Sequence, residues 1–71
     1  MLYVLLARST IVDRHTGELV AARGEVFTLH STRWAVLLVE RGKAEPSDRT
    51  TAEAIELALR LRAIAAPEAA S

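Results

Sequence analysis

The chain contains no cysteine, and this absence limits how 71 residues can form a stable fold. A disulfide framework and a thiolate metal site are both excluded. A domain near this size buries only about 60% of the surface that its unfolded chain exposes, so its stability depends on a small core. Because Tyr3, Phe27 and Trp34 are the only aromatic residues, that core must be aliphatic. Since 51% of the residues are hydrophobic, we expect some apolar surface to be buried against a partner subunit.

Short apolar runs separated by turn residues predict several strands. Residues 2–7 read as a strand, because the run is short and includes β-branched and aromatic side chains. The run lacks polar alternation, which indicates that both of its faces are covered, the second by this chain or by another one. Residues 8–17 form a connection rich in loop formers. Residues 18–21 and 26–29 then read as two short strands, with Gly24 in the turn between them.

Hydroxyl and glycine residues mark the ends of a first helix. Ser31 or Thr32 is expected to cap its first turn, and Gly42 is typical of the position just past a helix end. Ala44 then returns the chain to the sheet as a short strand, which Pro46 ends.

A second, longer helix follows, capped by Thr50 or Thr51, and is expected to extend to about residue 65 before Pro67 stops it. The whole pattern predicts an α+β fold with a small three- to four-stranded, mostly antiparallel sheet, one short helix and a longer C-terminal helix. The predicted organisation is a core domain of a β-hairpin and a helix at 1–49, a C-terminal helix at 50–66 packed on that domain or on a partner, and a frayed tail at 67–71.

The second helix is apolar over more than half of its circumference. One stripe at helical spacing is expected to pack on the chain's own sheet. It comprises Ala54, Leu57, Ala58, Leu61, Ile64 and Ala65. Ile55 and Leu59 lie on a flank beside Arg62, where they are either ordinary exposed residues or part of a docking surface. The first strand offers a second apolar surface, whose edge is suited to extending a neighbour's sheet. The predicted interface therefore consists of Leu2, Val4, Leu6, Ile55, Leu59 and Arg62.

The side chains that usually perform catalysis or bind metals do not cluster in this sequence. His15 lies in a loop and His30 at a strand-to-helix junction, without the fixed ligand spacing of a metal site. Ser31 is adjacent to His30 and is better explained as a helix cap than as a nucleophile. No glycine-rich phosphate loop occurs. We therefore predict no catalytic residue, no metal site and no cofactor, and a protein that is not an enzyme.

The charge pattern argues against nucleic acid as the main partner. The nine basic and nine acidic residues balance to a formal net charge of zero, whereas phosphate binding usually requires a basic excess. Arg23 in a turn and Arg33 near a helix start remain able to touch phosphates, so a nucleic-acid-binding regulator is one alternative function. Trp34 has helical spacing with Leu37 and Leu38, which predicts a core position for its ring.

The apolar run at residues 2–7 is too short to cross a membrane, which takes about 20 apolar residues. It also lacks the basic segment that precedes the apolar region of a signal peptide. We therefore expect the chain to be made in the cytoplasm and to have no membrane partner.

Residues 18–46 carry a pattern that resembles the small proteins encoded among the head and head–tail genes of tailed phages and prophages, including the Mu-like prophage N-terminal domain. The matching positions are Gly24-Glu25, Val26-Phe27, Ala35, Leu38-Val39, Gly42, Ala44 and Glu45. The resemblance implies a virion protein that binds capsid or head–tail connector proteins, and it assigns no functional residue. A cellular adaptor that forms homo-oligomers through its last helix is a second alternative.

Overall fold

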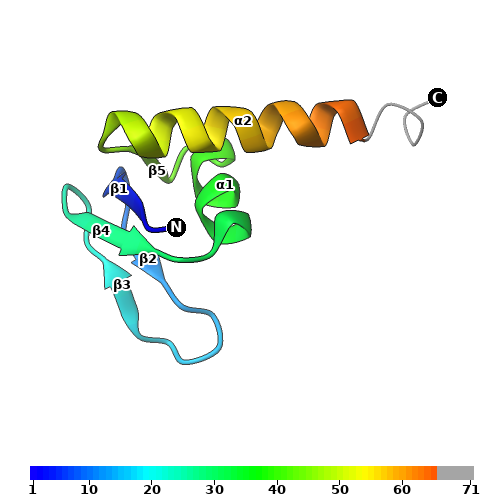
Figure 1. Ribbon diagram of the computed structural model, residues 1–71. Helices are drawn as coiled ribbons and strands as arrows, with labels where there is room; N and C mark the ends of the chain where they lie inside the picture. The colour runs from blue at the N-terminus through cyan, green and yellow to red at the C-terminus, as the bar shows by residue number, and fades with distance from the viewer. Residues whose placement is uncertain (66–71) are drawn as a thin grey trace.

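The computed structural model describes residues 1–65 of the chain, so Pro67 and the predicted tail lie outside the described residues. The described residues form two helices and five strands in two small antiparallel sheets, which confirms the predicted α+β class, and Figure 1 shows how they are arranged. The elements in chain order are β1 (Tyr3–Ala7), β2 (Ile11–Val12), β3 (Leu19–Ala21), β4 (Val26–Leu29), α1 (Thr32–Glu40), β5 (Ala44–Pro46) and α2 (Arg49–Ala65). The short helix α1 and the longer α2 match the prediction in kind and position.

The central sheet has the strand order β4-β1-β5. Strand β1 pairs with β4 along Tyr3–Leu6 and with β5 along Leu5–Ala7, both antiparallel. Every second residue of β1 is buried, namely Tyr3, Leu5 and Ala7, while Val4 and Leu6 are half-buried on the opposite face. The expectation that β1 offers a free edge to a neighbouring subunit is therefore wrong, because β5 occupies the edge that β4 leaves open.

The two strands expected to form a hairpin over residues 18–29 do not pair with each other. Instead β3 pairs with β2, in a separate two-stranded sheet. The turn before β4 redirects the chain: Gly24, with a φ of 89°, donates its N–H to the carbonyl of Ala7, and the N–H of Ala7 donates to the carbonyl of Glu25. These two bonds attach the turn to the end of β1, so that β4 continues along β1 and β3 remains free to pair with β2.

Helix α1 has both of the ends that the sequence predicts. Ser31 caps its start, where the side-chain oxygen accepts the N–H of Trp34. At the other end Gly42 has a φ of 71°, and the N–H groups of Gly42 and Lys43 donate to the carbonyls of Val39 and Leu38. This pair of bonds is the Schellman motif, which satisfies carbonyls that the end of a helix leaves without partners.

Gly42→Ala is expected to lower the free energy of unfolding by about 1 kcal/mol, because a Cβ disfavours the left-handed conformation. A Cβ at this position would meet no atom within 4 Å, so the loss would come from the backbone alone. Urea titration monitored by circular dichroism measures it. Asn tolerates the left-handed region better, so Gly42→Asn should lose less. Equal losses for both variants would contradict this explanation.

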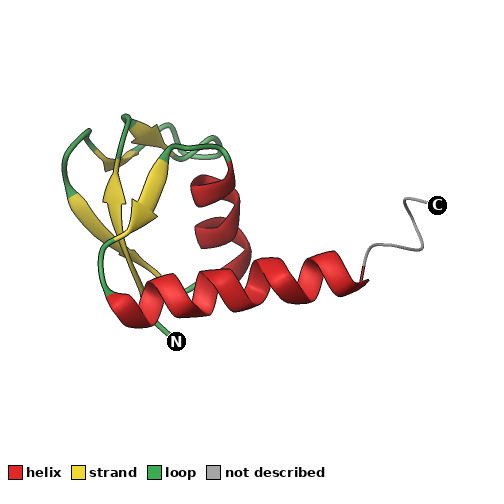
Figure 2. Ribbon diagram, turned by 90° about the horizontal axis from the view of Figure 1, so that it is seen from above, coloured by secondary structure: helices red, strands yellow, loops and turns green. Residues whose placement is uncertain are grey.

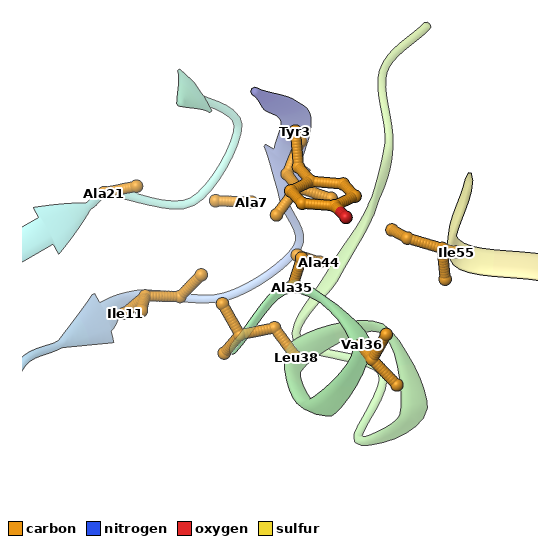
Figure 3. Close-up of a cluster of buried hydrophobic side chains, with 10 residues drawn as sticks. Tyr3, Ala7, Ile11, Ala21, Ala35, Val36, Leu38, Ala44 and Ile55 are labelled. Atoms are coloured by element: carbon orange, nitrogen blue, oxygen red, sulfur yellow. The ribbon is translucent and has the colours of Figure 1, made fainter. Parts of the chain in front are cut away.

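The core lies between the central sheet and the two helices, as Figure 3 shows for Tyr3, Val36 and Ile55 among others. Its buried hydrophobic residues are Tyr3, Leu5, Ala7, Ile11, Ala21, Ala35, Val36, Leu38, Ala44 and Ile55. One polar side chain, Thr51, is also fully buried. Its hydroxyl accepts the N–H of Val4 at 2.8 Å and so joins the start of α2 to β1.

The cap of α2 differs from the prediction. Asp48, and neither Thr50 nor Thr51, caps this helix: its carboxylate accepts the N–H of Thr51 at 2.7 Å. The hydroxyl of Thr51 is already bonded to β1, which leaves the capping position to the acid three residues before it. The first half of α2 packs on its own domain, because Thr51 and Ile55 are both buried there.

Candidate binding surfaces

The packed face of α2 is rotated relative to the prediction, although Ala54 and Ala58 of the predicted stripe do pack against the core. Ile55 is only 2% exposed and Leu59 is half-buried against the core, so neither residue forms an open docking surface. Leu57, Leu61 and Ile64, which were expected to face the sheet, are 52%, 56% and 65% exposed. Both faces have helical spacing, and the larger number of apolar residues favoured the wrong one.

Two polar contacts explain why α2 has this rotation. Thr51 bonds to Val4 at the start of the helix, and Arg62 bonds to Glu40 of α1 near its end, with an N–O distance of 2.6 Å. Residues 51, 55 and 62 lie on one face of a helix with 3.6 residues per turn, so these contacts point Ile55 into the core. Arg62, predicted to be part of an interface, instead connects the chain's own two helices.

The other predicted interface residues lie on or next to β1. Leu2 precedes the strand and is 46% exposed, whereas Val4 and Leu6 are half-buried. The backbone of Val4 is engaged on both sides, since its N–H donates to Thr51 and its carbonyl accepts the N–H of Ser47. The structure therefore does not bring the six predicted residues together into one surface.

An exposed apolar row lies on the side of α2 that faces away from the core. Leu57, Leu61 and Ile64 are spaced by four and three residues and so follow one line along the helix. We call this row the outer face of α2. Figures 1 and 2 show that the C-terminal end of α2 extends past α1 and the central sheet, and the row runs along the helix toward that end. The Glu56–Arg60 ion pair lies on the same exposed half of the helix.

A second surface is a hollow of about 320 Å³ between α1 and the β2–β3 hairpin. Its apolar lining includes Leu37 and Leu38 of α1 with Ile11 and Val12 of β2. Trp34 also lines this hollow. The residue packs against the core, as predicted, but it is only half-buried. Leu37 is exposed, contrary to its expected core position. We call this hollow the basic groove, because its remaining lining residues are Arg14, His15, Arg33, Arg41 and Lys43.

The distribution of ion pairs explains how a chain of zero net charge forms a basic groove. Within residues 1–65, four of the nine basic side chains form ion pairs, which leaves five without one. The paired residues are Arg8, Arg49, Arg60 and Arg62. Of the other five, Arg23 lies in a turn outside the groove, and the remaining four line it. No acidic residue is among the lining residues.

The loop that carries Arg14 and His15 is held in place by Asp13. Its carboxylate accepts the N–H groups of His15 and Thr16, and its carbonyl accepts the N–H of Gly17. This is an Asx-type turn, in which the acid bonds to its own loop. The carboxylate of Asp13 is therefore used to shape the loop and does not pair with Arg14.

Two acidic groups have a pKa below its ordinary value, and both stabilise helix contacts. The hydrogen bond from Arg62 lowers the pKa of Glu40 below its usual 4.5. The backbone hydrogen bond from Thr51 lowers the pKa of Asp48 below its usual 3.8. A lowered pKa in the folded state means that the folded state binds protons less readily than the unfolded chain. These groups therefore stabilise the fold above their ordinary pKa, and this contribution disappears as the pH falls through the lowered values.

We expect the urea midpoint of unfolding to decrease as the pH is lowered below about 4.5. Part of that decrease should disappear in the double variant Glu40→Gln and Asp48→Asn, which is less stable at neutral pH but depends less on pH. Urea titrations from neutral to acidic pH measure both curves, with Glu53→Gln as an exposed control. Parallel curves for the wild type and the double variant would contradict this assignment.

The described residues contain no cluster of side chains typical of a metal site. Within residues 1–65, no three His, Asp or Glu side chains gather as a metal site would require. Neither helix of that part is long and apolar enough to cross a membrane. Comparison with known protein families gives no match, and no curated protein and no solved structure matches the chain.

Proposed function

We propose that this chain is an accessory structural protein of a tailed-phage virion, which binds capsid or head–tail subunits through protein contacts and performs no catalysis. The observation that supports this proposal most is the outer face of α2, where Leu57, Leu61 and Ile64 are each more than half exposed. The phage setting comes from the resemblance of residues 18–46 to small phage head-region proteins. It is independent of the argument from exposed surface.

The outer face has the form of a helix that binds a groove or a second helix. Apolar residues at spacings of four and three are the usual anchors when an amphipathic helix binds another protein. Burying a leucine or isoleucine side chain contributes roughly 1.5–3 kcal/mol. Because α2 extends past the compact domain, a partner can reach this row without disturbing the core that Ile55 and Thr51 form.

The test is whether the chain is part of virions and is held there by this face. Virions would be purified after induction of the strain that encodes the chain, and the chain would be quantified by mass spectrometry. We expect it at a fixed ratio to a capsid or connector protein. Leu61→Asp should reduce the bound amount by about tenfold or more, because a charge would face the apolar contact. Ala63→Asp, at another exposed position on a different side of α2, should leave the bound amount unchanged.

Sedimentation of the purified variants separates the alternatives. Virions that lack the chain would overturn the proposal. If the chain then forms a discrete oligomer that Leu61→Asp dissociates, the cellular adaptor is the correct function. Retention of Leu61→Asp on virions at the wild-type level would keep the virion setting but reject the outer face of α2 as the contact.

A further inference from the structure

We propose that the basic groove binds an acidic segment of a partner protein that carries one apolar anchor residue. The proposal concerns a surface separate from the outer face of α2 and assigns it the chemistry of its ligand. It depends on the convergence of charges from different parts of the chain. Arg14 comes from the hairpin loop, Arg33 from the first turn of α1, and Arg41 and Lys43 from the segment that ends this helix.

Four cations around one hollow give it a positive potential that attracts an anion, most strongly at low salt. Elsewhere within residues 1–65 the chain pairs its arginines with its own acids, at Arg8–Glu45 and Arg49–Glu53 for example. At the groove no acid is among the lining residues and none of the four cations forms an ion pair within the described chain, although Arg41 is close enough to Glu40 to help lower the pKa of that carboxyl, and Asp13 is hydrogen-bonded within its own loop. Carboxylates are well matched to this site, because arginine donates two parallel hydrogen bonds to one carboxylate.

The apolar lining favours a protein segment over nucleic acid. Ile11, Val12, Leu37 and Leu38 line a space of about 320 Å³, which is suited to an aliphatic or aromatic side chain. A nucleic-acid strand would instead require exposed aromatic rings for stacking and a basic surface that continues beyond the groove. The single tryptophan of the chain, Trp34, is half-buried, and the arginines of α2, outside the groove, are in ion pairs with acids of the described chain.

A second hollow lies on the other side of α1 and shares Arg33, Leu37 and Arg41 with the basic groove. Its remaining cation, Arg62, is already paired with Glu40. The shared residues form an exposed ridge along α1, so a segment that occupies the basic groove can also contact this ridge. The basic groove has more cations without an ion pair than the second hollow has, so the groove sets the acidic character of the ligand.

Trp34 supplies the measurement, because it is the only tryptophan and lines the groove. The full chain would be titrated with a short synthetic peptide in which Asp and Glu flank a central Leu-Phe pair, at low salt. We expect a saturable change in tryptophan fluorescence. The same peptide with Asn and Gln in place of the acids should bind at least about tenfold more weakly, since the charge-assisted bonds are lost.

Matched charge reversals test where the peptide binds. Arg33→Glu should weaken peptide binding by about tenfold. The variant should remain folded, because an acid is favourable in the first turn of a helix. Arg23→Glu makes the same change at the unpaired cation outside the groove and should leave the affinity within about twofold. Leu61→Asp should also leave it unchanged, which separates this proposal from the function assigned to α2.

Three results would overturn the proposal. One is the absence of any saturable fluorescence change with the acidic peptide. Another is an equal loss of affinity in Arg23→Glu and Arg33→Glu, which would indicate diffuse charge attraction. The third is tighter binding of an oligothymidylate strand than of the peptide, which would assign the groove to nucleic acid and favour the regulator as the function.

Discussion

Replacing Ile55 with alanine is expected to unfold most of the protein at room temperature. Ile55 is 2% exposed and lies among Tyr3, Val36 and the half-buried residues of α2 (Figure 3). Removing a buried isoleucine side chain to alanine costs about 2–5 kcal/mol, because transfer free energy is lost and a cavity remains. A cysteine-free domain of this size rarely has more than about 3–5 kcal/mol of stability in total. Urea titration followed by circular dichroism measures the loss directly.

Leu57→Ala provides the matched control on the same helix. Leu57 is 52% exposed, so its truncation should change the free energy of unfolding by less than about 0.5 kcal/mol. Alanine is a better helix former than isoleucine or leucine, so both substitutions should slightly favour the helix. Helix propensity therefore cannot explain a larger loss of stability in Ile55→Ala than in Leu57→Ala. If Leu57→Ala were the more destabilising of the two, the rotation of α2 would be the one that the sequence pattern predicted.

The rotation of α2 could not be predicted from the sequence, because apolar residues cover more than half of the circumference of the helix. Periodicity identifies each stripe but does not say which one faces the sheet. The observed rotation is accompanied by hydrogen bonds between residues 47 and 22 positions apart, from the N–H of Val4 to the hydroxyl of Thr51 and from Arg62 to Glu40. Local patterns contain no information about such pairs. The helix itself was predicted well, since it depends on neighbouring residues only, and its predicted stop at Pro67 lies outside the described residues.

The strands show the same division between local and long-range information. Residues 26–29 and the return at Ala44 were predicted as strands from short apolar runs and from the position of Pro46. The pairing of β5 with β1, however, joins segments about forty residues apart and closes the edge that seemed free. The turn at Gly24 was also predicted correctly. The hydrogen bonds that attach this turn to Ala7, and so separate β3 from β4, could not be predicted from the sequence.

The basic groove was missed for a related reason. Its cations are separated by up to about thirty residues in the chain, and acids lie between them in the sequence. Along the sequence, therefore, the basic residues of the groove are balanced by neighbouring acidic residues, and no basic segment stands out. The folded structure sorts the charges differently, because Glu40, Glu45, Glu53 and Glu56 pair with arginines outside the groove. Arg33 was named from the sequence as a residue able to touch a ligand, and it is the one such residue that lines the groove.

Thr51→Val is expected to lower the free energy of unfolding by about 1–3 kcal/mol. The substitution keeps the shape of the side chain but removes the oxygen that accepts the N–H of Val4 at 2.8 Å. That N–H would then lack a partner beneath α2, and an unsatisfied buried donor costs about this amount. The bond connects the first turn of α2 to the central strand β1, so its loss should also loosen the contact that sets the rotation of the helix.

Thr50→Val is the matched control, because Thr50 precedes Thr51 in the same turn and is exposed. Both substitutions exchange a hydroxyl for a methyl group on a β-branched residue, so their effects on helix propensity are nearly equal. Thr50→Val should therefore change the stability by less than about 0.5 kcal/mol. Hydrogen exchange supplies a local measurement: in Thr51→Val the amide of Val4 should exchange faster than the global loss of stability explains. A Thr51→Val protein as stable as the wild type, with Val4 still protected, would mean that the hydroxyl does not hold α2 against β1.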